Sequence, residues 1–191
     1  MMDERGLIRR SKEGDESAFA ELVVLKREKV FRIALNIVGT EDDAKDIAQI
    51  AFVRLWQSIG SFDESQRFDP WFFRIVVNLS LDHWRRRRRS VESVPIGAPV
   101  EPEPPIAPMG SAQDAAVYRA EIRRIFDEAA RRLTPQQRAA FTLREIEGLT
   151  TEEIARVLRV RSSTVRNHLL QARRVLQDYL RRRYPEIARG R

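Results

Sequence analysis

The sequence has no cysteine and only two histidines, His83 and His168. Without cysteine the chain can form no disulfide and has no thiolate to act as nucleophile or metal ligand. Neither histidine has a carboxylate cluster beside it at metal-ligand spacing, so we expect no metal site and no cofactor. No apolar run approaches the roughly 20 residues that a membrane span needs, and the first ten residues lack the apolar core of a signal peptide. We therefore expect a cytoplasmic protein without membrane insertion.

The sequence also lacks the patterns of an enzyme that acts on nucleic acid. It has no phosphate-binding glycine loop, no acidic or histidine cluster for a divalent metal, and no nucleophile with a base nearby. Basic residues nevertheless outnumber acidic ones by 35 to 28, which gives a net charge of +7. This excess favours a polyanionic partner. The sequence therefore predicts a protein that binds nucleic acid and is not an enzyme.

The stretch from Leu133 to Arg183 has the pattern of a helix-turn-helix. Thr134 followed by Pro135 begins one helix, because a capping hydroxyl and a proline at the first helical position both favour a helix start. Gly148 ends that helix, since glycine adopts the left-handed cap without strain. Thr150, with a glutamate three residues later, forms a capping box that begins a second, short helix.

A third helix is predicted to begin at Ser162 or Ser163, after a turn through Arg159, a position where glycine is usual. Its outward positions carry short hydrogen-bonding side chains first and arginines later: Ser162, Ser163, Thr164, Arg166, Asn167, Gln171, Arg173 and Arg174. That order suits a helix that enters the major groove by its N-terminus, reading bases there and contacting phosphates along its side. The alternative is a small helical bundle with a solvated, arginine-rich face.

Residues 41–59 predict a helix with two different stripes. One stripe is apolar and docks the helix on a core: Ala44, Ile47, Ala48, Ala51, Leu55 and Ile59. The other is acidic at its start and apolar at its end: Asp42, Asp46, Gln49, Val53 and Trp56. Apolar anchors flanked by charges suit contact with a helix of another protein. The alternative is that both stripes are covered within the same domain.

An aromatic segment that ends in arginines follows. A polar loop over residues 58–69 contains Phe62 and Phe68, Pro70 begins a helix, and five consecutive arginines, Arg85 to Arg89, end it. Aromatic rings beside arginines suit single-stranded nucleic acid, because an unpaired base can stack on a ring while arginines hold the phosphates. An aromatic core is the alternative interpretation of the same pattern.

Composition changes abruptly over residues 90–113, which contain six prolines, three glutamates and no lysine or arginine. Such a stretch cannot form a packed helix and predicts an extended linker that keeps its neighbours apart. Residues 114–132 return to helical spacing. We therefore expect an all-α protein of two small helical domains, residues 1–89 and 114–191, joined by the proline-rich linker.

Three stretches, in this order, also carry a family resemblance: DDAKDIAQIAFVRLWQSIGSF, WFFRIVVNLSLDHWRRRRR and LTPQQRAAFTLREIEGLTTEEIARVLRVRSSTVRNHLLQARRVL. Together they resemble the bacterial RNA polymerase sigma factors of the sigma-70 family, specifically the extracytoplasmic-function (ECF) group. The resemblance implies a sigma-2-like helical bundle and a sigma-4-like helix-turn-helix domain. It also implies a protein that binds core RNA polymerase and directs promoter recognition and opening in transcription initiation.

The resemblance implies a role for particular residues. The segment that docks on the β′ clamp helices of polymerase contains Asp43, Asp46, Gln49, Val53 and Trp56. The segments that open the −10 element and capture unpaired bases contain Phe62, Phe68, Asn78, Asp82, His83, Arg85, Arg86, Arg87 and Arg88. The −35 recognition helix contains Ser162, Ser163, Arg166, Asn167 and Arg173.

The partners implied by the resemblance are core polymerase, through its β′ clamp helices and β flap, promoter DNA and an inhibitory anti-sigma factor. A stand-alone helix-turn-helix transcriptional regulator is the alternative function. Such a regulator would have no use for the second stripe of residues 42–56 or for the arginine run.

Overall fold

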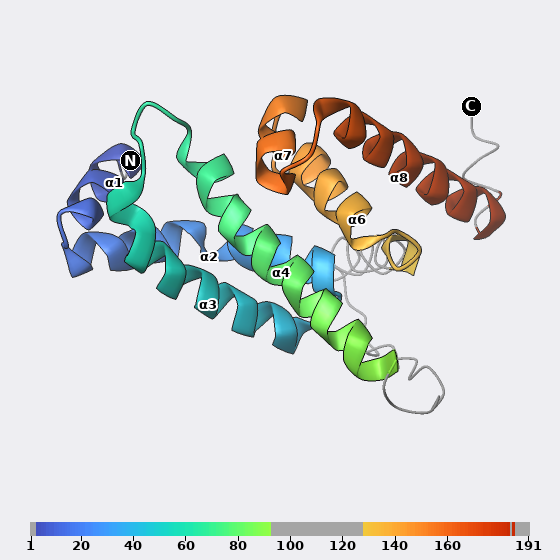
Figure 1. The fold of residues 1–191 in the computed structure, drawn as a ribbon, viewed down its shortest axis with the longest axis horizontal. Coiled ribbons are helices and arrows are strands. Elements are labelled where there is room, and N and C mark those ends of the chain that lie inside the picture. Colours follow the sequence, from blue (N-terminus) through green and yellow to red (C-terminus); the bar gives the residue numbers. More distant parts are fainter. Residues whose placement is uncertain (1–2, 93–127, 184, 186–191) are drawn as a thin grey trace, which may run out of the picture.

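The computed structural model describes residues 3–92, 128–183 and 185, and all regular elements among them are helices. The all-α prediction is therefore confirmed. The first lobe contains α1 (Glu4–Lys12), α2 (Glu16–Val38), α3 (Glu41–Ser58), the 3-10 turn η1 (Ile59–Ser61) and α4 (Phe68–Glu92). The second lobe contains α6 (Pro135–Phe141), the π-helical segment η2 (Thr142–Ile146), α7 (Thr151–Leu158) and α8 (Ser162–Arg183) (Figure 1).

The predicted linker lies almost entirely outside the described residues. Only residues 90–92 are described, and they extend α4 three positions beyond the expected end of the first domain at residue 89. Of the helix expected over residues 114–132, residues 128–132 are described: residues 128–130 are helical and residues 131–132 form a turn.

The helix starts and stops follow the local capping chemistry. The side chains of Thr134 and Thr150 each accept a hydrogen bond from the backbone three residues on, and both capping boxes are complete. Gly148 adopts the predicted left-handed conformation, with φ of 68°. Thr40 precedes α3 but makes no capping bond, because its hydroxyl donates to the carboxylate of Asp43 instead.

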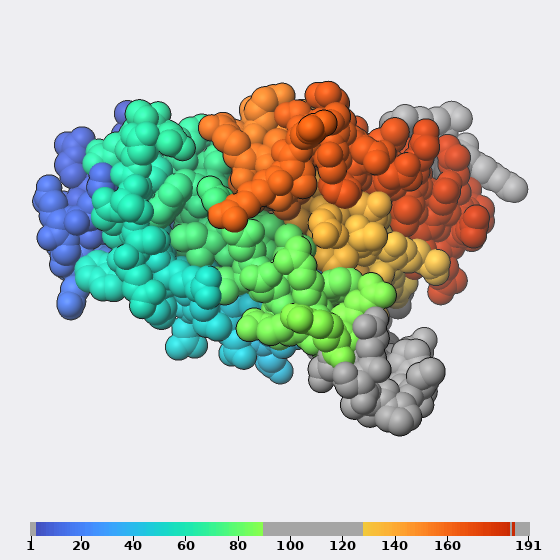
Figure 2. Space-filling view, in the orientation of Figure 1, coloured from blue at the N-terminus to red at the C-terminus, as the bar shows by residue number. Residues whose placement is uncertain are grey.

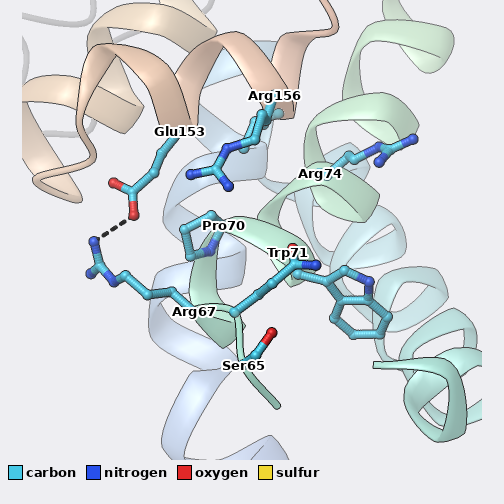
Figure 3. A pocket seen from close by; sticks show the side chains of 9 residues that line it. Ser65, Arg67, Pro70, Trp71, Arg74, Glu153 and Arg156 are labelled. Carbon is cyan, nitrogen blue, oxygen red and sulfur yellow. Dashed lines mark hydrogen bonds and ion pairs between the residues drawn. The ribbon is translucent and has the colours of Figure 1, made fainter. Parts of the chain in front are cut away.

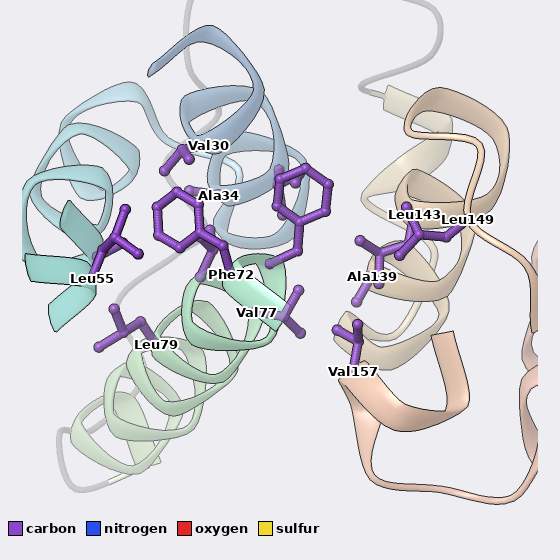
Figure 4. Packing of buried hydrophobic residues seen from close by; sticks show 14 of the residues in the cluster. Val30, Ala34, Leu55, Phe72, Val77, Leu79, Ala139, Leu143, Leu149 and Val157 are labelled. Atoms are coloured by element: carbon purple, nitrogen blue, oxygen red, sulfur yellow. The ribbon is translucent and has the colours of Figure 1, made fainter. Parts of the chain in front are cut away.

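The first lobe buries α2, α3 and α4 against one another around apolar side chains, among them Val30, Leu55, Phe72 and Leu79 (Figure 4). Leu55 belongs to the predicted inward stripe of α3, of which Ala44, Ile47 and Ala51 are buried as well. This apolar face docks α3 on the rest of the lobe and sets the orientation of the helix.

A buried lysine attaches the start of α4 to the rest of the first lobe. The Lys26 ammonium is almost fully covered and pairs with Asp69 in the first turn of α4 and, at 2.8 Å, with Glu4 of α1. Lys29 adds a second contact to Asp69 at 3.1 Å. Burial raises the pKa of Asp69, but hydrogen bonds and attraction from Lys26 and Lys29 outweigh it, so the pKa lies below its ordinary value.

The two lobes are not held apart but pack directly on each other (Figure 2). Helix α4 lies against α7, and α2 lies against α6, so that one continuous apolar core runs through both lobes. Figure 4 shows Val77 of α4 facing Ala139 of α6 and Val157 of α7 across this contact. The expectation of two separated bodies is therefore wrong for this structure, because both lobes have an apolar face that the other covers.

The turn between α7 and α8 generates a first prediction. Arg159 has φ of 54° and ψ of 46°, and it is the one non-glycine residue with positive φ among the described residues. A side chain costs about 1 to 2 kcal/mol in this conformation, and glycine removes that cost while adding some unfolded-state entropy. Arg159→Gly should therefore raise the free energy of unfolding by about 0.5 to 1 kcal/mol in urea titrations, with an unchanged slope.

The matched control is Arg161→Gly, which removes the same side chain two positions later, where φ is not positive. This control should leave stability unchanged or lower it. Equal effects of the two substitutions would contradict the explanation from backbone strain.

The Lys26–Asp69 pair generates a second prediction. Asp69→Asn leaves the buried ammonium with Glu4 alone, so the free energy of unfolding at pH 7 should fall by about 2 kcal/mol. Because the folded-state pKa of Asp69 lies below the unfolded value of 3.8, its contribution is complete above that pH and is lost as pH falls through the lower value. Urea titrations between pH 7 and pH 2 measure both effects.

The control is Asp178→Asn, which changes an exposed carboxylate on α8. The difference in stability between wild type and Asp69→Asn should shrink as the solution is acidified, whereas that for Asp178→Asn stays small throughout. A pH-independent difference for Asp69→Asn would disprove the assigned ion pair.

Candidate partner and nucleic-acid interfaces

The second stripe of α3 is exposed. Asp46 and Gln49 are open to solvent, Val53 is 53% exposed and Trp56 is 37% exposed, although the ring of Trp56 also contacts Phe19, with centroids 4.8 Å apart. The alternative in which the lobe covers both faces of α3 is therefore excluded. Exposed Val and Trp side chains in one line mark a surface that another molecule can cover.

This stripe borders a groove between α2 and α3. One part, of about 500 Å³, is lined by apolar Val23, Phe31, Ala48, Phe52 and Val53 with a charged rim of Arg27, Glu28 and Lys45. A second hollow, of about 360 Å³, continues to Phe19 and Trp56. The contribution of Val23 and Phe31 from α2 was not predicted from the sequence. The four consecutive apolar residues 22–25 were the available signal, since one helix face cannot bury all four.

Asp43 does not extend the exposed stripe. Its carboxylate accepts the Thr40 hydroxyl, lies 3.3 Å from Nε2 of His83 and pairs with Arg87 at 2.9 Å. The hydrogen bond from Thr40 lowers the pKa of Asp43, and the nearby His83 and Arg87 lower it further, to a smaller extent. The Asp43 carboxylate is therefore ionised. Asp43 thus joins the start of α3 to the end of α4. It connects the residues predicted to bind polymerase with those predicted to bind the −10 element.

Phe62 and Phe68 are buried, with 4% and 6% exposure, and their rings lie 5.2 Å apart. Their predicted contact with unpaired bases is corrected, because neither ring has a free face. The two rings pack with Trp71 on the buried side of the loop of residues 62–67, and the ring centroid of Trp71 is 5.0 Å from that of Phe62. The exposed part of this loop is polar and consists of Asp63, Glu64, Ser65, Gln66 and Arg67.

The C-terminal part of α4 presents most of the other predicted residues at the surface. Asp82 and Arg85 to Arg88 are exposed, and Asn78 and His83 are half-buried. Trp84, half-buried too, has the guanidinium of Arg88 5.6 Å from its ring centroid. Cations and an aromatic edge therefore lie together along one helix, as nucleic-acid binding requires.

A cleft of about 420 Å³ lies where the loop of residues 62–67 meets the second lobe. Figure 3 shows Trp71 and Arg74 of α4 on one side and Glu153 and Arg156 of α7 on the other. Arg67 reaches across it to Glu153 at 2.7 Å. Trp71 and Arg74 were not among the predicted site residues. The aromatic Trp71 fits a core position of α4, and a single arginine on a helix gives no signal in the sequence.

Helix α8 presents the predicted recognition residues on its outer side. Ser163, Arg166, Asn167, Arg173 and Arg174 are exposed, whereas Ser162, Thr164 and Gln171 are half-buried. The opposite face buries apolar side chains against α6 and α7: Val165, Leu169, Ala172 and Leu176. The helix points away from the first lobe (Figure 1). Arg173 pairs with Glu145 of the same lobe at 2.6 Å, whereas the exposed N-terminal residues Ser163, Arg166 and Asn167 face solvent.

Comparisons with known proteins agree on one family. The model described as Sigma-70 region 2 matches residues 22–90, and that described as Sigma-70, region 4 matches residues 123–176. The chain is 34% identical over 181 residues to the ECF RNA polymerase sigma factor SigE of Mycolicibacterium smegmatis, covering 93% of this chain and 68% of that protein. The chain belongs to the ECF group of the sigma-70 family. Members of this family are transcription initiation factors that bind RNA polymerase and direct promoter recognition.

Other ECF relatives align over nearly their full length. The RNA polymerase sigma-H factor of Pseudomonas aeruginosa is 30% identical over 178 residues, covering 91% of this chain and 92% of the relative. The ECF sigma factor SigW of Bacillus subtilis is 28% identical over 177 residues, covering 91% and 95%. Both lobes of this sigma factor therefore have counterparts in its relatives.

Solved structures show the same fold. CnrH, solved in complex with the cytosolic domain of CnrY, superposes with a TM-score of 0.68 at 25% identity and covers 95% of this chain and 99% of its own. The sigma factor RpoE of Bartonella quintana, solved with the anti-sigma factor NepR, gives a TM-score of 0.65 at 24% identity over 85% and 96%. Among the described residues of this sigma factor, no helix is both long and apolar enough to cross a membrane.

Proposed function

We propose that the two lobes of this ECF sigma factor divide promoter recognition between them. Residues 1–89 bind core polymerase and the opened −10 strand, residues 114–191 read the −35 duplex, and residues 90–113 connect them. The observation that carries the proposal is the exposed stripe on α3, because it sits in the matched region 2 and gives the lobe a surface for a partner protein. A stand-alone regulator needs no such surface.

The proposed polymerase site is the groove between α2 and α3. Its apolar floor, with Val53 and Trp56 at one edge, suits the apolar face of a helix, and Asp46, Gln49 and the charged rim set the register. The occupant that fits is a clamp helix of the β′ subunit. Asp43 contributes indirectly, since it fixes α3 to α4 rather than facing the groove.

The proposed −10 site follows the loop of residues 62–67 and the exposed side of α4. Ser65, Gln66 and Arg67 offer hydrogen bonds to an unpaired base or its phosphate, while Phe62 and Phe68 hold the loop in place from the core. Along α4 the strand contacts are polar or basic: Asn78, Asp82, His83, Arg85, Arg86, Arg87 and Arg88. The proposed −35 site is the outer face of α8, with Ser163, Arg166 and Asn167 near its N-terminus.

The energetics make the protein dependent on polymerase. Opening DNA costs about 1 to 2 kcal/mol per base-pair step in stacking. Capture of one or two bases returns about 1 to 3 kcal/mol each. Polymerase contacts must therefore supply the remainder when several base pairs open.

The cellular setting follows from the same proposal. A sigma factor acts where polymerase and chromosome lie, which places this one in the cytoplasm. Two of its structural neighbours were solved with a second protein, the cytosolic domain of CnrY in one and the anti-sigma factor NepR in the other. We include an anti-sigma factor among the partners of this chain on that basis.

The polymerase site generates a third prediction. Val53→Glu places a charge in the apolar part of the groove and should weaken binding to core polymerase by at least about tenfold, equivalent to about 1.4 kcal/mol. Leu180→Glu makes the same change at an exposed leucine of the second lobe and serves as the control. Titration of labelled protein with core enzyme measures both, and unchanged binding of Val53→Glu would favour the stand-alone regulator.

A fourth prediction concerns promoter opening. The isolated protein should bind promoter duplex weakly and leave its thymines unreactive to permanganate, whereas addition of core polymerase should make thymines of the −10 element reactive. Footprints of the same promoter with and without core enzyme check this. Reactive thymines without core enzyme would show that the energetic argument is wrong.

A further inference from the structure

We propose that helix α1 holds the loop of residues 62–67 in the shape that reads an unpaired base, with Lys12 as the main positioning residue. No residue of α1 was predicted to belong to a site, yet α1 lies beside this loop where the loop leaves η1 (Figure 1). The effect on DNA rests on the proposed −10 site. The hold of α1 on the loop does not, and it can be measured without DNA.

The Lys12 ammonium binds the beginning of the loop. Its Nζ donates to the backbone carbonyl of Phe62 at 2.9 Å and to the carboxylate of Glu64 at 3.0 Å. An ammonium has three donors, so one side chain can hold both acceptors at once. The Lys12 side chain is only 22% exposed, and Phe62 lies 50 residues further along the chain. The contact is therefore tertiary, and because one acceptor is a main-chain carbonyl, it fixes the backbone of the loop itself.

Glu64 is held by α1 at a second point. A terminal nitrogen of Arg9 lies 3.5 Å from the carboxylate oxygen that Lys12 does not contact. The hydrogen bond from Lys12 lowers the pKa of Glu64, and Arg9 lowers it further, so the carboxylate is ionised. Both of its oxygens are thus attached to the last turn of α1. Exposed ion pairs of this kind add little to stability, so the contact acts mainly on the position of the loop.

The end of the loop is attached to the same helix through Lys26. The buried Lys26 ammonium contacts Glu4 in the first turn of α1 at 2.8 Å, and it also contacts Asp69, two residues after the loop. Leu7 and Ile8 of α1 are buried in the core of the lobe. Helix α1 therefore has one fixed place on the lobe and is connected to the chain on both sides of the loop.

Hydrogen bonds within the loop orient the groups that would read a base. One carboxylate oxygen of Asp63 accepts the backbone N–H of Ser65 at 2.9 Å, and the other accepts Nε2 of Gln66 at 3.1 Å. The backbone N–H of Gln66 donates to the carbonyl of Asp63 at 3.0 Å. Donors and acceptors that are already in place lose less conformational freedom when a base binds, so a matching base binds more tightly.

Lys12 places this internal turn on α1. Asp63, whose side chain orients Ser65 and Gln66, lies between the two residues that Lys12 holds. Loss of the ammonium frees the turn to shift while the helices stay folded, because the apolar contacts of α1 with the core remain. A residue that only adds stability would act on unfolding of the whole lobe instead. The two roles therefore differ in what is lost when Lys12 is replaced.

Lys12→Met tests this role, because it keeps the apolar stem and removes the ammonium. Amide hydrogen exchange at Ser65 and Gln66 should become at least about tenfold faster, as expected from the loss of charge-assisted hydrogen bonds. Exchange in α2 and α3 should not change. Lys12→Arg keeps a cation with enough donors for both acceptors, and its loop should exchange within about twofold of the wild-type rate.

Arg10→Met is the matched control. It removes a cation from the same turn of α1, together with an ion pair to Asp15 at 2.6 Å that does not involve the loop. Loop exchange should therefore stay at the wild-type rate. Circular dichroism and urea titrations check that both variants keep their helices and lose similar, small amounts of stability. Unchanged loop exchange in Lys12→Met, or an equal increase in Arg10→Met, would overturn the proposal.

Sequence discrimination measures the consequence for DNA. The wild-type protein, bound to core polymerase, selects a preferred decamer from a randomised single-stranded pool, and the readout is the affinity for that decamer relative to a scrambled one. Lys12→Met should lower this ratio at least about fivefold, whereas Lys12→Arg and Arg10→Met should leave it unchanged. Because Lys12→Met and Arg10→Met have the same net charge, nonspecific attraction to DNA does not distinguish them.

The two readouts separate failure of this proposal from failure of the proposed function. If loop exchange responds to Lys12→Met but the affinity ratio does not, or if the wild type selects no decamer, the proposed −10 site is wrong and the hold of α1 on the loop stands. If loop exchange does not respond, Lys12 is not a positioning residue, whatever the result with DNA.

Discussion

Helix α4 is the element on which the rest of the structure depends, because it packs on both lobes at once. One side is buried against α2 and α3, and another lies against α7. Its first turn is attached to α2 through Lys26 and Asp69, and its last turns contribute the arginines of the proposed −10 site. Any displacement of α4 therefore moves the core of the first lobe, the interlobe contact and the nucleic-acid surface together.

The interlobe contact combines an apolar patch with charges that only the other lobe can neutralise. Apolar burial supplies attraction without direction, whereas the Arg32–Glu147 and Arg67–Glu153 pairs require one relative placement. Buried ion pairs of this kind add little net stability, since desolvation offsets most of the attraction. An interface built this way fixes the relative placement of the lobes without adding much stability.

Much of this fold is determined locally. The capping boxes at Thr134 and Thr150 and the left-handed Gly148 depend on contacts within a few residues, so the sequence alone predicts the helices that they delimit. The recognition face of α8 is predictable for the same reason, because its apolar residues recur at helical spacing. Local chemistry does not always decide a cap, since the Thr40 hydroxyl bonds the Asp43 side chain rather than the backbone of α3.

The sequence by itself determined the all-α class, the helix-turn-helix, the family and the two different stripes of α3, since periodicity, capping and motif order are properties of neighbouring residues. Only the tertiary structure decided that the second stripe is exposed, that Phe62 and Phe68 are core rather than surface, that Asp43 faces α4 and that the lobes meet. An aromatic ring can pack in a hydrophobic core or stack on a nucleic-acid base. The role of a given ring depends on which elements pack over it, and these elements come from distant parts of the chain.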